Sequence, residues 1–184
     1  ILAARPSVGK TAFALNLARN AALDKFKPTA VAFFSLEMSG KQLIKRMLSC
    51  ESELRLDKIQ RGRMDDNENR QLYERGIQPL SEAKIFIDDT PGLNIFELKS
   101  KCRRMKSKHD VGLIIIDYLQ LMSGTGNKGQ NRENEISEIS RNLKQIAKEL
   151  NIPIIALSQL SRQTEHSSNT QPQLADLRES AALE

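Results

Sequence analysis

The sequence has 184 residues, of which 39% are hydrophobic and 28% charged, a balance that suits one globular domain rather than a disordered or fibrous chain. Its apolar runs are too short to span a bilayer, and its two cysteines, Cys50 and Cys102, lack the C-x-x-C spacing of zinc sites. A cytoplasmic location is therefore expected. Because the chain starts at Ile1, within an apparent strand, we expect it to be a piece of a longer protein.

Basic residues exceed acidic ones by five, 28 against 23, and the excess is concentrated in residues 97–108 (ELKSKCRRMKSK). Apolar residues recur at helical spacing through this segment, at Ile95, Leu98, Cys102 and Met105. The favoured interpretation is therefore an amphipathic helix whose bases form a solvated face. A phosphate-attracting patch or a subunit contact is the alternative.

Strand-like and helical patterns alternate along the chain. In order, the sequence predicts a strand ending near Ala3, a helix at 10–23, a strand at 30–36, helices at 41–49 and 66–76, a strand at 84–87, a helix at 95–108, a strand at 113–117, a helix at 133–150 and a strand at 154–158. The strands are almost continuously apolar, which is typical of strands covered on both faces. We therefore predict one α/β domain over residues 1–184, with a mainly parallel sheet and helices on both faces.

Two polar stretches interrupt this alternation, at residues 123–132 (SGTGNKGQNR) and 162–172 (RQTEHSSNTQP). Both follow predicted strand ends, where α/β sheets place functional loops. We expect both to be mobile loops. Their composition fits an ordinary solvated linker equally well.

Residues 4–11 (ARPSVGKT) match the phosphate-binding pattern G-x-x-x-x-G-K-[ST], except that Ala4 replaces the first glycine. They lie between a predicted strand and a predicted helix, as a phosphate loop requires. Backbone N–H groups of such a loop face the phosphates, Lys10 neutralises their charge, and Thr11 offers its hydroxyl to Mg²⁺. The pattern favours a nucleotide site over a decorative loop, formed by Ala4, Arg5, Pro6, Ser7, Val8, Gly9, Lys10 and Thr11.

Two further predicted strands end in acids of the kind that a hydrolytic phosphate site needs. Asp117 ends the run LIIID and is placed to hold the water shell of Mg²⁺, although a strand-end aspartate can also cap a turn. Glu37 follows the run FFSL and is a candidate general base for the attacking water, although an isolated glutamate is usually a surface charge. The convergence of strand ends on one phosphate site favours the catalytic interpretation.

Gln159 follows the last predicted strand. Its neutral amide suits hydrogen bonding to the γ-phosphate or to the attacking water, so it can report whether that phosphate is present. A simple turn role for Gln159 or Ser158 is the alternative. His109 and His166 have no partners at metal-ligand spacing, and we assign them no role.

Five motifs occur in the order ARPSVGKT, FFSLEM, LIIIDYLQLM, ALSQLSR and DLRES. With them the sequence closely resembles the RecA-like motor domain of DnaB-type replicative DNA helicases over essentially its whole length, and alanine at the first loop position is normal in that family. The resemblance implies a P-loop NTPase core that uses ATP and Mg²⁺ at the subunit interfaces of a homo-hexamer translocating on single-stranded DNA. By the same resemblance, Lys10 and Thr11 belong to the phosphate loop and Glu37 is the catalytic glutamate. Asp117 is the aspartate that holds the metal, and Gln159 is the glutamine that senses the γ-phosphate.

The resemblance extends to DNA and to protein partners. Arg178 and Glu179 match a segment that lies beside the DNA backbone, whereas Arg46 looks like the family's base-contacting arginine and is assigned to the nucleotide site. Ala181 and Ala182 replace the Gly-Ser that usually follows, and the loss of backbone freedom argues against a DNA contact at Ala181. Primase and a helicase loader are implied as partners. The family's N-terminal collar domain and its arginine finger lie outside this sequence, so we expect the domain to be truncated at both ends.

Aromatic residues make up only 4% of the sequence, and none lies in the two polar stretches. Base stacking is therefore not expected, and any grip on single-stranded DNA should be phosphate-based and salt-sensitive. Two other functions stay open at this point: a RecA-type recombinase and a non-motor ATP-binding module. The motifs SLEM and DLRES argue against the recombinase.

Overall fold

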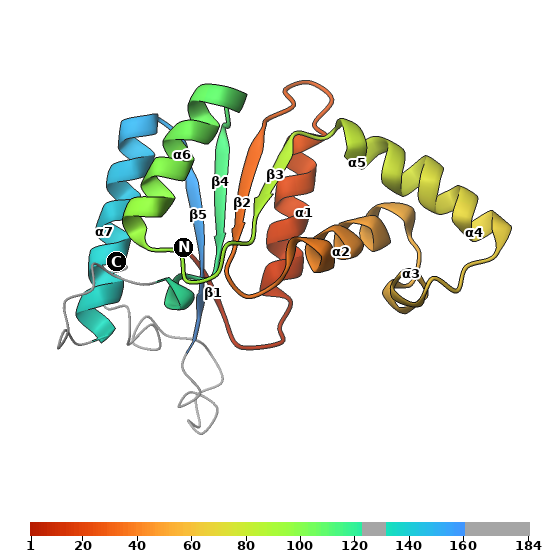
Figure 1. Ribbon diagram of the computed structural model, residues 1–184, viewed down its shortest axis with the longest axis horizontal. Helices are drawn as coiled ribbons and strands as arrows, with labels where there is room; N and C mark the ends of the chain where they lie inside the picture. The colour runs from red at the N-terminus through yellow and green to blue at the C-terminus, as the bar shows by residue number, and fades with distance from the viewer. Residues whose placement is uncertain (123–131, 161–184) are drawn as a thin grey trace.

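The computed structural model describes residues 1–122 and 132–160. They form a five-stranded sheet in which all paired strands are parallel, with the order β1-β5-β4-β2-β3 (Figure 1). The strands are β1 (Leu2–Ala4), β2 (Val31–Ser35), β3 (Ile85–Asp88), β4 (Leu113–Asp117) and β5 (Ile154–Gln159). The predicted strands are confirmed, with ends shifted by no more than one residue.

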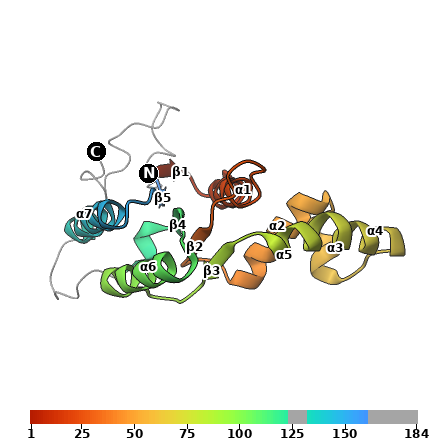
Figure 2. The same cartoon turned by 90° about the horizontal axis from the view of Figure 1, so that it is seen from above.

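Helices cover both faces of this sheet, as Figure 2 shows from above. One face packs against α1 (Lys10–Ala22) and α2 (Gly40–Ser52), and the other against α6 (Ile95–His109) and α7 (Arg132–Leu150). The predicted α/β class with a mainly parallel sheet is therefore confirmed. Within residues 1–122 and 132–160, no helix has the length and apolar character needed to cross a membrane.

Side chains of the central strands alternate between two cores. Phe33 and Ile115 pack toward α1 and α2, whereas Phe34, Ile114 and Ile116 pack toward α6 and α7. All five are buried to 1% exposure or less. Because successive residues of a strand point to opposite faces, a strand covered on both sides is apolar at almost every position, which explains the nearly continuous runs in the sequence.

The segment between α2 and β3 differs from the prediction. It contains α3 (Leu56–Arg61), α4 (Asp66–Gln71), the π-helical segment η1 (Leu72–Ile77) and α5 (Gln78–Glu82). The helix predicted at 66–76 thus continues to Glu82. Pro79 does not stop it; it lies at the start of α5, directly after the π-helical segment η1. The short α3 has no buried residue and hence no apolar stripe to predict it.

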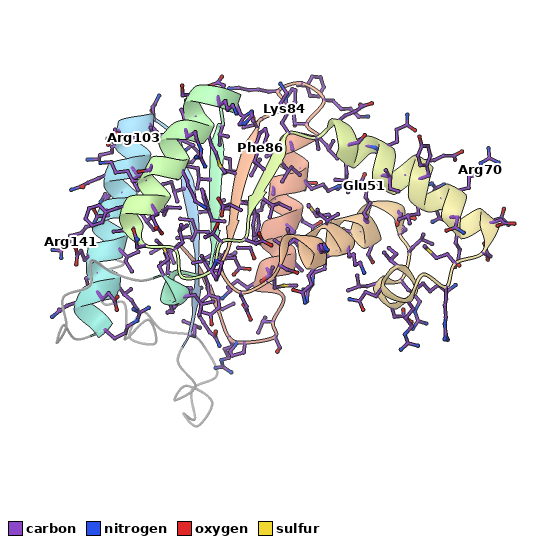
Figure 3. All side chains as sticks on the ribbon, viewed as in Figure 1. Glu51, Arg70, Lys84, Phe86, Arg103 and Arg141 are labelled. Carbon is purple, nitrogen blue, oxygen red and sulfur yellow. The ribbon has the colours of Figure 1, made fainter. Side chains whose placement is uncertain are left out.

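The basic segment 97–108 lies in α6, and the predicted apolar stripe is buried at Ile95, Leu98 and Cys102. Burial raises the pKa of the Cys102 thiol to about 12, so it is a protonated core side chain. Bases of the helix pair with nearby acids: Lys99 and Arg103 with Glu149, Lys101 with Asp88, and Lys106 with Asp110. Arg103 is labelled in Figure 3. These pairs reduce the unbalanced charge of the helix and favour the solvated-face interpretation.

Parallel strands bring their carboxyl ends to one edge of the sheet. The register pairs Ala4 with Gln159 and Ser35 with Asp117. The start of the phosphate loop, the end of β5 and the turn before Glu37 therefore meet at this edge, where open α/β sheets bind their ligands.

Candidate nucleotide site

A cavity of about 430 Å³ opens at the carboxyl edge of the sheet. Its lining residues are Arg5, Pro6, Ser7, Gly9, Lys10, Thr11, Ala12, Glu37, Met38, Arg46 and Gln159. The structure thus brings together predicted site residues from four separate parts of the chain. Of the other predicted residues, Ala4 ends β1, Val8 is exposed to solvent, and Asp117 is buried beside Thr11.

The loop before α1 has the shape of an anion cradle. Ser7 and Gly9 adopt left-handed backbone conformations, with φ angles of 62° and 95°. Gly9 then accepts a 2.9 Å hydrogen bond from the backbone N–H of Phe13, so the helix begins directly at the cavity. The unpaired N–H groups and the positive end of the helix macrodipole favour a bound phosphate there, and no acid in the first turn of α1 competes with it.

Gly9→Ala is expected to weaken binding of a nucleoside triphosphate and to lower the free energy of unfolding by about 1–2 kcal/mol, because an L-residue is strained in the left-handed region. A Cβ at Gly9 would meet no atom within 4 Å, so the cost arises from the backbone and not from a clash. Gly62→Ala is the matched control, because Gly62 is also left-handed with open space around it. It should lose similar stability, measured by denaturant unfolding, and keep nucleotide affinity. Equal affinity in both variants would contradict this role of Gly9.

Thr11 and Asp117 form the part of the site that suits a metal ion. The Thr11 hydroxyl donates a 2.6 Å hydrogen bond to Oδ2 of Asp117, which is fully buried. The other oxygen, Oδ1, is buried without a hydrogen-bond partner among the described residues. Burial raises the pKa of Asp117, while the Thr11 hydrogen bond and the charges of Lys10 and Arg46 oppose that rise. An unsatisfied carboxylate oxygen beside a hydroxyl fits the oxygen ligands and ordered waters that Mg²⁺ prefers.

Lys10 lies between two acids and an aromatic ring. Its Nζ atom sits 4.5 Å from the centroid of the Tyr118 ring. Burial lowers the pKa of Lys10, and the negative charges of Asp117 and Glu37 oppose that shift. Burial, with the same two acids, raises the pKa of Tyr118. The ring therefore remains a neutral platform that holds the ammonium group in the cavity by a cation–π contact.

Glu37 stands on a tight turn whose backbone is fixed from two sides. The Ser35 hydroxyl donates to the carbonyl of Met38 at 2.7 Å and accepts from its N–H at 3.2 Å. The N–H of Leu36 donates to the carbonyl of Asp117 at 2.7 Å. The Glu37 side chain itself is exposed to solvent at the cavity. This arrangement suits a general base, which needs a fixed backbone and access to water.

Several residues that shape the site were not predicted. Tyr118 holds Lys10, and Gln120 and Arg132 hold the chain around the end of β5. Tyr118 and Gln120 directly follow the strand that ends in Asp117, and this position is the only signal that the sequence offers for them. Arg132 was assigned to a polar loop, but it is the first residue of α7.

Some predicted functional residues lie outside the described residues. These are the DNA-binding candidates Arg178 and Glu179. His166, Ala181 and Ala182, which have no predicted role, also lie outside them. The same holds for the polar stretch 162–172 and for residues 123–131 of the other stretch. Their roles stay predictions.

Comparison with protein families and curated proteins gives consistent matches. The model of the DnaB-like helicase C terminal domain matches residues 1–184. The chain is 48% identical to the replicative DNA helicase DnaC of Bacillus subtilis and 47% identical to the replicative DNA helicase DnaB of Geobacillus stearothermophilus, each over 184 residues. Both alignments cover all of this chain but only 40% of the relative, so the chain spans about two fifths of their length.

Solved structures give the same result at the level of the fold. A DnaB-like replicative helicase, whose structure was described together with its interactions with primase, superposes with a TM-score of 0.88 at 39% identity and covers 99% of this chain and 44% of that one. The ATPase domain of G40P superposes with a TM-score of 0.89 at 39% identity, over 99% of this chain and 64% of that one. The predicted RecA-like core is therefore confirmed.

Proposed function

The chain belongs to the DnaB-like helicase C-terminal domain family, and on this premise we propose that it is the ATP-hydrolysing motor domain of a replicative DNA helicase. In the full-length protein it would work in a homo-hexamer that hydrolyses ATP at its subunit interfaces. Hydrolysis would drive movement along single-stranded DNA and unwinding of the duplex at the replication fork. This proposal depends on one observation. Lys10, Thr11, Glu37 and Gln159 line the same cavity, beside the buried Asp117.

The phosphates of ATP would bind where the loop ends and α1 begins. Backbone N–H groups and the helix dipole favour the β-phosphate there, and Lys10 places its charge near the β- and γ-phosphates. Thr11 and Asp117 would hold Mg²⁺, which supplies neutralisation of phosphate charge when bound. Arg46 lines both this cavity and an adjoining one of about 230 Å³ between α1 and α2, which supports a contact of Arg46 with the nucleobase of ATP.

Glu37 would accept the proton of the attacking water. Its turn is tied to the end of β4, so the base keeps a fixed relation to the residue proposed to hold the metal. Gln159, from the far side of the cavity, would donate its amide N–H to the γ-phosphate and change partner once that phosphate has left. The cycle of binding and release at Gln159 is a candidate signal from the nucleotide to the DNA path.

The partners proposed for the full-length protein follow the family. They are single-stranded DNA through Arg178 and Glu179, further copies of the same chain, primase and a helicase loader. The solved helicase described with its primase interactions supports the primase proposal. We further propose that residues 1–184 are one domain of that longer protein, in the cytoplasm.

The proposal is tested with the full-length protein by two measurements: ATPase activity with and without single-stranded DNA, and unwinding of forks that carry only a 5′ or only a 3′ tail. A helicase motor should show DNA-stimulated hydrolysis and unwinding that requires one defined tail. Hydrolysis that DNA does not stimulate, without unwinding, would identify a non-motor ATPase. Strand exchange in place of tail-dependent unwinding would identify a recombinase.

Arg178→Ala is expected to weaken binding of single-stranded DNA about equally for all sequences and to lower the slope of log affinity against log salt by about 1. Basal ATPase activity should persist, while its stimulation by DNA falls. Arg70→Ala is the control, because Arg70 is an exposed basic residue near the end of α4 (Figure 3) that forms a local ion pair with Glu74. A salt titration in which Arg178→Ala and Arg70→Ala have the same slope would remove Arg178 from the DNA path.

A further inference from the structure

The end of β5 reaches beyond its neighbour β4. Register pairing between these strands stops at Ile116 and Ala156, yet β5 runs on to Gln159. On its other side β5 stays paired with β1, where Ala4 lies opposite Gln159. On the side facing β4, the backbone at Gln159 therefore has no strand partner among the described residues, and its N–H and C=O groups need other hydrogen-bond partners.

The side chain of Gln120 supplies that partner. Its amide nitrogen donates to the hydroxyl of Ser158 at 2.8 Å and to the carbonyl of Gln159 at 3.0 Å. Its amide oxygen accepts from the N–H of Gln159 at 3.3 Å. A side-chain amide has the same donor and acceptor groups as a peptide unit, so Gln120 replaces one residue of the missing strand. It engages both backbone groups of Gln159.

Gln120 is itself held in place. It lies in the 3₁₀ turn η2 (Leu119–Leu121), flanked by Leu119 and Met122, which are 1% and 2% exposed. The guanidinium of Arg132, at the start of α7, donates to the carbonyl of Gln120 at 2.7 Å and to that of Met122 at 3.2 Å. The turn is thus anchored by the core on one side and by α7 on the other.

We propose that Gln120 is a positioning residue that fixes the backbone of Gln159 and thereby aims the Gln159 amide into the nucleotide cavity. Gln120 follows Asp117 by three residues. One short segment therefore carries the buried carboxylate proposed to hold the metal and also fixes the position of the end of β5. This inference rests on the proposed contact of Gln159 with the γ-phosphate. A purely structural Gln120, which only stabilises the sheet, would affect folding but not the turnover step.

The test uses Gln120→Met in the full-length protein, because methionine keeps the length of the side chain and removes all three hydrogen bonds. We expect kcat for ATP to fall on the order of 10-fold and KM to stay within about twofold, since misplacement of a group by about 1 Å costs up to about 10²-fold. Gln71→Met is the matched control. Gln71 also donates from its amide to a backbone carbonyl, that of Ser52 at 2.7 Å, and it lies away from the cavity. It should keep wild-type kcat.

The double variant Gln120→Met/Gln159→Ala separates positioning from an independent effect. If Gln120 acts through Gln159, the double variant should turn over no more slowly than Gln159→Ala alone. Fully additive losses, or a wild-type kcat in Gln120→Met beside an impaired Gln159→Ala, would overturn the inference. Wild-type turnover in Gln159→Ala would instead overturn the proposed role of Gln159 itself.

Folding of each variant is checked by its far-UV circular dichroism spectrum, which should match that of wild type. If Gln120→Met fails this check, Gln120→Glu takes its place, because glutamate retains the oxygen that accepts from the Gln159 N–H and loses the two donated bonds. Its kcat should lie between wild type and Gln159→Ala, with unchanged KM. A wild-type kcat in that variant would also count against the inference.

Discussion

Glu37→Gln in the full-length protein is expected to lower ATP turnover on the order of 10²–10⁴-fold while leaving ATP affinity nearly unchanged. The substitution keeps the shape of the side chain and removes its ability to accept a proton. The structure supports a separable effect, because the turn that carries Glu37 is held by Ser35 and by the backbone of Leu36, not by the Glu37 carboxylate. Steady-state hydrolysis and equilibrium binding of ATP, measured on the same preparation, check the two halves of this result.

Glu74→Gln is the matched control for Glu37→Gln. Glu74 lies in η1, away from the cavity, and forms an ion pair with the exposed Arg70. The same chemical change there should leave turnover and affinity at wild-type values, since exposed ion pairs contribute about 1 kcal/mol or less to stability. Loss of ATP binding together with turnover in Glu37→Gln would make Glu37 a structural residue and leave the site without its base.

The sequence was sufficient to predict which strand-end residues lie together at the carboxyl edge of the sheet. Strands buried on both faces are almost continuously apolar, so the end of each run marks the carboxyl edge of the sheet, where ligands bind. Asp117 and Gln159 each stand at the end of such a run, and Glu37 stands two residues beyond one. The phosphate loop was equally visible, because its pattern lies between a strand and a helix.

The residues that hold this site could not be predicted in the same way. Tyr118, Gln120 and Arg132 act through contacts with parts of the chain that are distant in sequence, and none of them follows a periodic pattern. A glutamine after a strand is equally consistent with an exposed turn. Its role depends on β5 being longer than β4 at this edge, which is a property of the register and not of local sequence.

Helix α3 and the extension through α5 were missed for a related reason. Both are short, and neither has a fully buried residue, so no apolar stripe marks them. The apolar periodicity of α6, by contrast, followed from the need to bury Leu98 and Cys102 against the sheet. Secondary structure that does not contribute to a core leaves little trace in the hydrophobic pattern.

Lys10→Ala is expected to lower ATP turnover by at least about 10²–10³-fold and to weaken ATP binding as well. This is the loss that typically follows removal of one preorganised electrostatic donor. Lys10 is the first residue of α1 and points its charge into the same cavity as Glu37 and Gln159. An alanine there leaves the backbone cradle intact but removes the point charge on the phosphates. Lys144→Ala, on the exposed side of α7, removes the same charge far from the cavity and should retain wild-type activity.

Loss of Lys10 should also change the pH dependence of Mg²⁺-ATP binding. Burial already raises the pKa of Asp117, and the positive charge of Lys10 opposes that rise. Without Lys10 the pKa of Asp117 should rise further, so the carboxylate becomes protonated at a higher pH as the pH falls. Binding of Mg²⁺-ATP to Lys10→Ala should therefore be lost at a higher pH than in the wild type, whereas Lys144→Ala should titrate like the wild type.

Lys10→Met separates charge from packing in this prediction. Methionine retains an aliphatic side chain against the Tyr118 ring but carries no charge. If the charge is what matters, Lys10→Met and Lys10→Ala should lose ATP turnover to the same extent and share the shifted pH profile. Recovery of turnover in Lys10→Met would assign the effect to packing against Tyr118. Wild-type turnover in both variants would show that the phosphates do not bind at the start of α1, and the nucleotide site would have to lie elsewhere in the protein.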